Sequence, residues 1–110
     1  MHVERIKFER TGGFAGMRIA TDIEPKQLSD EQSQALLNML DALDFAGLPE
    51  QLMSESPVPD EYTYTITVEA DDWKHTVVTG DSSAPEEMQE LLQMLDRIAR
   101  KRRRKRHNPI

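Results

Sequence analysis

The chain has 110 residues, of which 37% are apolar, so it can bury one hydrophobic core but has little room for a second domain or a deep cofactor cavity. It contains no Cys, which excludes disulfides, thiolate metal ligands and thiol nucleophiles. The formal net charge of -6 hides a segregation, because residues 1–96 sum to -14 and residues 97–110, which hold eight bases and no acid, to +8.

Two short alternating segments flank a pair of glycines near the start of the chain. Apolar and polar side chains alternate over residues 5–9 and again over residues 17–21. Gly12 and Gly13 lie between them, and glycine readily adopts the positive φ angles that tight hairpin turns require. The pattern predicts an antiparallel β-hairpin with its tip near residues 11–13.

A helix is predicted to follow this hairpin. Residues 29–32 fit a capping box, and apolar residues recur behind it at helical spacing over residues 36–43. We expect this helix to end near residues 46–47, because Gly47 can adopt the left-handed C-cap conformation and Pro49 cannot continue a helix. Residues 49–60 are then predicted to form a loop.

The second half of the chain repeats this order of elements. Residues 62–69 alternate strictly, residues 71–72 read as a turn, and residues 73–79 read as the returning strand. A second capping box at residues 83–86 opens another amphipathic helix. The sequence therefore predicts an α+β fold of the order ββαββα, in which two helices pack on one face of an antiparallel four-stranded sheet. We place the domain at residues 1–96 and interpret residues 97–110 as a basic helix end and flexible tail.

No group of residues predicts catalysis or the binding of a cofactor or metal. The three His, at positions 2, 75 and 107, lack the spacing of metal ligands, and we expect a structural or surface role for His75. The sequence contains no phosphate-binding glycine loop, nucleophile elbow or zinc-protease motif. We therefore predict that the chain is not an enzyme and needs no cofactor.

The segment of residues 10–16 is richer in glycine than a hairpin requires. Gly16 is a third glycine, and Phe14 falls out of phase with the apolar positions of the following strand. Two interpretations stay open: Phe14 folds back over the edge of the sheet, or the loop is a rigid protrusion that inserts into the groove of a partner.

The sequence Ile-Lys-Phe-Glu-Arg-Thr-Gly-Gly-Phe-Ala-Gly at residues 6–16 resembles the opening signature of the emfourin family. Members of this family, the protealysin inhibitors, are small bacterial proteins that inhibit thermolysin-like metalloproteases. The resemblance continues through residues 45–49, 59–68, 75–77 and 84–86, and so spans about residues 3–95. It does not cover the basic tail.

The resemblance implies a tight, reversible inhibitor whose loops occupy the active-site cleft of a thermolysin-like metalloprotease. A loop that is already rigid loses less entropy on docking. Residues 11–16 contain no carboxylate or His, so we expect steric occlusion of the cleft rather than capture of the zinc ion. The residues expected to bind the protease come from the Gly-rich loop and from the segment before the second hairpin: Arg10, Thr11, Gly12, Gly13, Phe14, Pro57, Pro59, Asp60 and Glu61. We expect the free protein to be a monomer. We also expect it to be cytoplasmic, because no signal peptide or membrane-spanning run is visible.

The basic run at residues 97–106 leaves an alternative function open. Such a run can bind nucleic-acid phosphates with salt-sensitive affinity, which would make the protein a regulatory or nucleic-acid-associated module. However, it contains no aromatic residue for base stacking, and the acidic body repels a polyanion, so we do not expect a nucleic-acid partner. A third hypothesis is that the tail contacts the acidic surface of a second copy.

Overall fold

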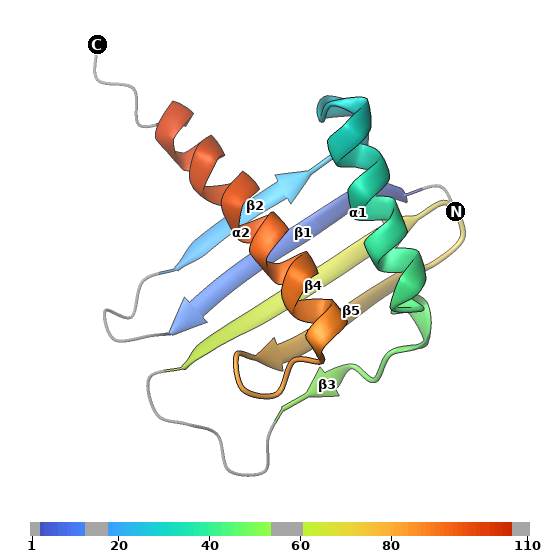
Figure 1. Ribbon diagram of the computed structural model, residues 1–110, viewed down its shortest axis with the longest axis vertical. Helices are drawn as coiled ribbons and strands as arrows, with labels where there is room; N and C mark the ends of the chain where they lie inside the picture. The colour runs from blue at the N-terminus through green and yellow to red at the C-terminus, as the bar shows by residue number, and fades with distance from the viewer. Residues whose placement is uncertain (1–2, 13–17, 54–60, 107–110) are drawn as a thin grey trace.

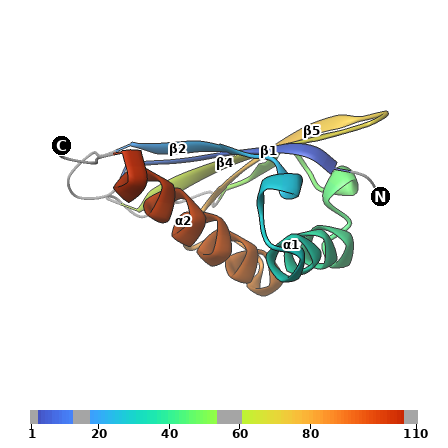
Figure 2. The ribbon, with the colours of Figure 1, turned by 90° about the horizontal axis from the view of Figure 1, so that it is seen from above.

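Five strands and two α-helices make up the part of the chain that the structure describes. The computed structural model describes residues 3–12, 18–53 and 61–106, with side chains as far as Lys101 in the last helix. In chain order the elements are β1 (Val3–Gly12), β2 (Ile19–Ile23), the 3-10 turn η1 (Pro25–Gln27), α1 (Asp30–Ala42), the 3-10 turn η2 (Phe45–Gly47), β3 (Gln51–Leu52), β4 (Tyr62–Ala70), β5 (Lys74–Gly80) and α2 (Glu86–Arg106). The strands form one sheet in the order β2-β1-β4-β5-β3. Both α-helices lie against the same face of this sheet, which confirms the α+β class (Figures 1 and 2).

Both predicted hairpins are present. β1 and β2 pair antiparallel from Ile6 opposite Ile23 to Arg10 opposite Ile19. Of the tip predicted near residues 11–13, Thr11 and Gly12 lie in β1, and Gly13 lies outside the described residues. β4 and β5 also pair antiparallel, joined by the predicted turn at residues 71–72. The hairpins meet along β1 and β4, which are antiparallel to each other and form the centre of the sheet.

The prediction of a four-stranded antiparallel sheet is wrong in one respect. The segment of residues 49–60, predicted to be a loop, contains the short strand β3, which runs parallel to β5 with Gln51 opposite Val78. The amide of Val78 donates to the carbonyl of Glu50 at 2.8 Å, and the hydroxyl of Thr79 donates to the carbonyl of Leu52 at 3.0 Å. A strand of two residues is too short to show alternation, so the sequence carries no periodic signal for it.

Helix α1 begins where the sequence predicts but ends earlier. The hydroxyl of Ser29 accepts a hydrogen bond from the amide of Gln32 at 3.1 Å, as a capping box requires. The helix ends at Ala42 rather than near residues 46–47, because Asp44 adopts the left-handed conformation with φ of 48°. The chain then forms η2, which buries the Phe45 side chain.

Helix α2 begins at Glu86 and continues to Arg106. Ser83 does not cap it, because its hydroxyl accepts instead from the amide of Gly80 at 3.0 Å. Residues 97–106 prolong the helix, and Ile98 and Ala99 are still buried. The division of the chain at residue 96 stays a prediction.

The hydrophobic core lies between the sheet and the two helices. Its fully buried side chains come from both layers: Ile6, Phe8, Ile23, Leu36, Leu40, Phe45, Ile66, Val68, Val77, Met88, Leu91 and Leu95. On the opposite face the described chain places no helix, and polar side chains pair across strands, as in the 2.8 Å bond between the hydroxyls of Thr67 and Thr76. This one-sided packing is typical of an antiparallel sheet with one solvated face.

Candidate functional site

Two segments that are far apart in the sequence meet at one end of the sheet. β1 ends at Gly12 and β4 begins at Tyr62, and these two residues are opposite each other in the register (Figure 1, lower left). A Cβ atom built on Gly12 would lie 2.9 Å from the carbonyl oxygen of Glu61, and Gly12 has a φ of +90°. This position therefore requires glycine both for its backbone conformation and for the close approach of the neighbouring strand.

The described members of the predicted binding set all lie at this end of the sheet. They are Arg10, Thr11, Gly12 and Glu61, from the end of β1 and the residue before β4. The other predicted residues, Gly13, Phe14, Pro57, Pro59 and Asp60, lie outside the described residues. The structure thus brings the two predicted segments together where it describes them. We call this end, defined by Thr11, Gly12 and Glu61, the loop-bearing end.

Arg10 does not lie on the surface of this end. Only 8% of the residue is exposed, because it follows Ile6 and Phe8 on the face of β1 that the helices cover. Its guanidinium group lies 2.9 Å from a carboxylate oxygen of Asp96 on α2 and 4.4 Å from the centre of the Tyr62 ring. The alternation of residues 5–9 already places position 10 on the apolar face, so period two alone could have indicated its burial.

Glu61 is held by the turn between β5 and α2. One oxygen of its carboxylate accepts from the hydroxyl of Ser82 at 2.7 Å and from the amide of Ser82 at 3.3 Å. The other oxygen, Oε1, is buried and has no hydrogen-bond partner among the described residues. These contacts fix the Glu61 side chain against the turn.

Asp81 binds the start of β4 from the same turn. Its carboxylate accepts from the amide of Tyr62 at 3.2 Å and from the hydroxyl of Tyr64 at 2.7 Å. Burial, together with the hydrogen bond to the Asp81 carboxylate, raises the pKa of Tyr64 well above its usual range. Sequence reasoning missed the roles of Asp81 and Ser82, because their partners are about 20 residues away and are brought close by the pairing of β4 with β5.

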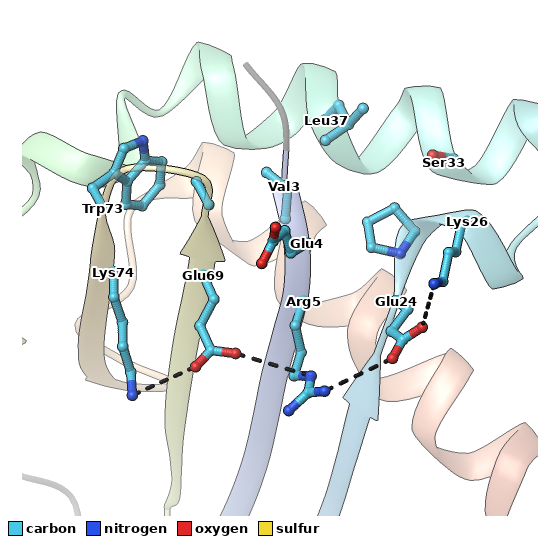
Figure 3. A pocket seen from close by; sticks show the side chains of 12 residues that line it. Val3, Glu4, Arg5, Glu24, Lys26, Ser33, Leu37, Glu69, Trp73 and Lys74 are labelled. Carbon is cyan, nitrogen blue, oxygen red and sulfur yellow. Dashed lines mark ion pairs between the residues drawn. The ribbon is translucent and has the colours of Figure 1, made fainter.

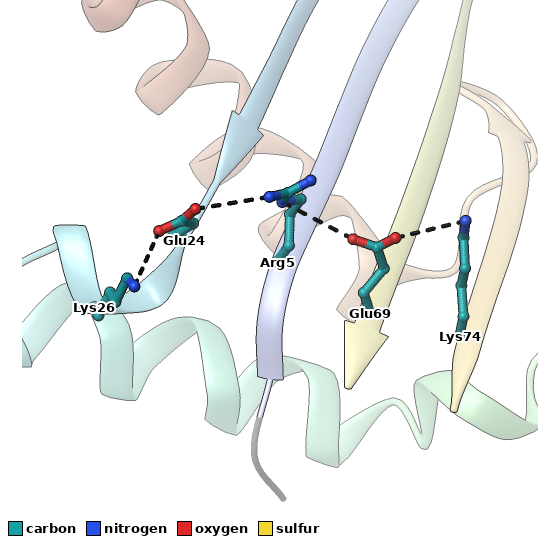
Figure 4. A network of polar contacts seen from close by, with 5 residues as sticks. All are labelled: Arg5, Glu24, Lys26, Glu69 and Lys74. Carbon is teal, nitrogen blue, oxygen red and sulfur yellow. Dashed lines mark ion pairs between the residues drawn. The ribbon is translucent and has the colours of Figure 1, made fainter. Parts of the chain in front are cut away.

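A groove of about 950 Å³ lies at the opposite end of the sheet, between the strands and α1 (Figure 3). A chain of ion pairs crosses its rim in the order Lys26, Glu24, Arg5, Glu69 and Lys74, with nitrogen to oxygen distances of 3.5 to 3.9 Å (Figure 4). Each of these five side chains is at least a quarter exposed, so each ion pair contributes little stability. Because the two charge signs alternate along the rim, the groove has no evident preference for an anion or a cation.

The described residues offer no obvious metal site. No group of three or more His, Asp or Glu side chains within them is arranged to hold a metal ion. His75 has a structural contact, because its Nε2 atom lies 2.7 Å from the carbonyl oxygen of Leu48 and its ring meets the Phe45 ring edge-on. Within the described part of the chain, no helix is long and apolar enough to cross a membrane.

These features describe a small α+β domain that brings two separate segments together at one end of its sheet. The sequence model of the emfourin family matches residues 8–96, and the chain therefore belongs to the emfourin family. Membership confirms the predicted resemblance and the prediction that the chain is not an enzyme.

Two further comparisons accompany this match. The solved structure of emfourin (M4in) from Serratia proteamaculans, an M4 family peptidase inhibitor, is 20% identical to this chain. The alignment covers 79% of this chain and 83% of that one, with a TM-score of 0.43. No curated protein matches the sequence.

Proposed function

We propose that the protein inhibits a thermolysin-like metalloprotease of the M4 family. The observation that carries this proposal is the match of the emfourin family over residues 8–96, which is most of the chain. The solved relative described above is an M4 family peptidase inhibitor. The partner is thus a protein, and the interaction is reversible association without chemistry on the inhibitor.

We further propose that the loop-bearing end enters the active-site cleft and excludes substrate sterically. Gly12, Gly13 and Phe14 form the inserting element, and residues 57–61 form a second contact. The adjacency of Gly12 and Glu61 supports this arrangement, because one cleft can then receive both segments. Two hydrogen bonds support it too: Asp81 accepts from the amide of Tyr62 in β4, and Ser82 donates to Glu61. They hold the residues beside the loops in place, and a segment that is already ordered loses less entropy on binding.

The test is a titration of a thermolysin-like protease with the wild type, Phe14→Ala and Gly13→Glu. We expect Phe14→Ala to weaken inhibition about tenfold or more, as loss of a buried aromatic anchor does. Gly13→Glu adds a bulky charge at the predicted contact and should weaken it further. Lys74→Gln, in the groove at the other end, is the matched control and should inhibit like the wild type.

Two results would count against the proposal in different ways. Unchanged inhibition by both loop variants would remove the loop-bearing end from the binding site while leaving the inhibitor function intact. Failure of the wild type to inhibit any M4 protease would remove the function itself.

A further inference from the structure

Asp96 and Arg10 form a nearly buried ion pair beneath the loop-bearing end. Their side chains are 17% and 10% exposed, and their charged groups are 2.9 Å apart. Asp96 comes from the middle of α2, whereas Arg10 lies on β1, two residues before Gly12. The pair therefore connects the helix layer to the strand that leads into the Gly-rich loop.

Arg10 depends on few contacts for its position. A guanidinium group keeps its charge at any ordinary pH, so a buried one needs a counter-charge or hydrogen bonds. The Nε atom of Arg10 is buried without a hydrogen-bond partner among the described residues. Among the described residues, its charged group contacts the Asp96 carboxylate on one side, as an ion pair in which Oδ1 of Asp96 makes no hydrogen bond, and the face of the Tyr62 ring on the other.

Tyr62 lies next to both segments of the loop-bearing end. It is opposite Gly12 in the pairing of β1 with β4, and it directly follows Glu61 in the chain. A shift of the guanidinium group would therefore move the ring that packs against it and disturb the point where the two segments meet.

We propose that Asp96 is a positioning residue for inhibition: its carboxylate fixes Arg10, and Arg10 fixes Tyr62 at the base of the loop-bearing end. This inference rests on the proposed function. It also gives Arg10 a different role from the predicted one, because a side chain that is nearly buried under α2 acts on the protease through its neighbours rather than by direct contact.

Arg100 supplies a matched control. It binds the other oxygen of Asp96 at 3.0 Å, but its side chain is 60% exposed. Replacing Arg100 by Gln removes the positive charge of an exposed neighbour of this carboxylate and leaves Arg10 paired with Asp96. The two arginines thus separate the effect of positioning from the effect of charge near Asp96.

The experiment compares the wild type with Asp96→Asn, Arg100→Gln and the double variant Arg10→Leu/Asp96→Leu. Two quantities are measured for each folded variant: the rate of dissociation from an M4 protease, and the amide resonances of Gly12 and Glu61 in the free protein. We expect Asp96→Asn to dissociate about tenfold faster and to shift both resonances, while Arg100→Gln changes neither. The double variant replaces a buried pair by apolar side chains, so we expect it to unfold near the wild-type temperature but still to dissociate fast.

Each outcome decides the question. If the double variant regains both stability and slow dissociation, the pair only stabilises the fold and the inference is overturned. A folded Asp96→Asn protein with unchanged dissociation and resonances also overturns it, and if that variant does not fold, the double variant decides. If the wild type inhibits no M4 protease, the proposed function fails, and the resonances of the free protein still show whether Asp96 positions Gly12 and Glu61.

Discussion

At the scale of single residues, position 12 makes two structural demands that only glycine meets. Its φ of +90° lies in the left-handed region, and a Cβ atom would lie 2.9 Å from the backbone oxygen of Glu61. Gly12 is also the residue of β1 that lies beside Glu61, where the two predicted binding segments meet.

We therefore expect Gly12→Ala to lower the free energy of unfolding by about 1–3 kcal/mol, and to weaken inhibition at temperatures where the variant is folded. Urea unfolding and inhibition titrations measure the two effects. Gly47→Ala is the control, because Gly47 lacks a positive φ and the atoms nearest to its Cβ would be those of the Asp44 carboxylate, at the end of a side chain. Equal costs for both substitutions would contradict the importance of the Gly12 conformation.

Tyr64 makes the stability of the fold sensitive to high pH. Its pKa is raised in the folded state, so above about pH 10 the unfolded chain loses the phenol proton while the folded chain retains it. The folded state then binds more protons, and the free energy of unfolding must fall as the pH rises, by up to about 1.4 kcal/mol per pH unit.

We expect Tyr64→Phe to remove this dependence, and to cost about 1 kcal/mol at neutral pH by deleting the bond to Asp81. Urea unfolding at several pH values from neutral to alkaline measures the slope. A wild-type slope that is no steeper than that of the variant would show that burial of Tyr64 does not raise its pKa as described.

At the scale of elements, the sequence predicts best where a local pattern decides the structure. The alternation of β1, β4 and β5 and the capping box of α1 depend on neighbours within a few residues, and the structure confirms them. The short strand β3 and the early end of α1 at Asp44 depend on contacts with distant parts of the chain, so no local pattern reveals them.

The same distinction applies to the candidate site. The glycines and the family signature predict where the binding segments lie in the chain, and the described residues Gly12 and Glu61 of these predicted segments are adjacent. The residues that support them, Asp81, Ser82 and Asp96, come from elements that tertiary packing brings near, and they carry no motif of their own.

The cap of α1 provides a test at this scale. Ser29→Ala should lower the free energy of unfolding by about 1 kcal/mol, because the amide of Gln32 loses its acceptor. Ser29→Asp should restore most of this loss, since Asp is an equally good N-cap. Thermal or urea unfolding checks both, and a loss that Asp does not restore would mean that Ser29 acts through something other than capping.

At the scale of the whole molecule, the segregated charge coincides with one long helix. Glu86 and Glu87 open α2 and basic residues close it, which matches the direction of the helix dipole at both ends. Ile98 and Ala99 are buried although they lie within the basic segment of residues 97–110, so the hydrophobic core extends into that segment.

Two truncations separate the core from the tail. Ending the chain after Lys101 keeps Ile98 and Ala99, the last buried residues that the structure describes, and we expect fold and inhibition to persist. Ending it after Asp96 removes Ile98 and Ala99 and should cost about 2 kcal/mol or more. Equal stability of the two truncated proteins would support a domain boundary at residue 96.

The same truncations address the alternative roles of the basic run. Retardation of nucleic acid at physiological salt that disappears on truncation after Lys101 would support a nucleic-acid-associated module. Light scattering at low and high salt tests the expected monomer, because association through exposed charges weakens on screening.

The loop-bearing end and the groove with its chain of ion pairs lie at opposite ends of the sheet. β1 spans ten residues between them, which corresponds to roughly 30 Å at about 3.3 Å per residue. Lys26 and Lys74 at the groove are 83% and 61% exposed. A fluorophore or surface linker coupled to either amine would therefore report on or immobilise the protein while leaving Gly12 and its neighbours free to meet a protease.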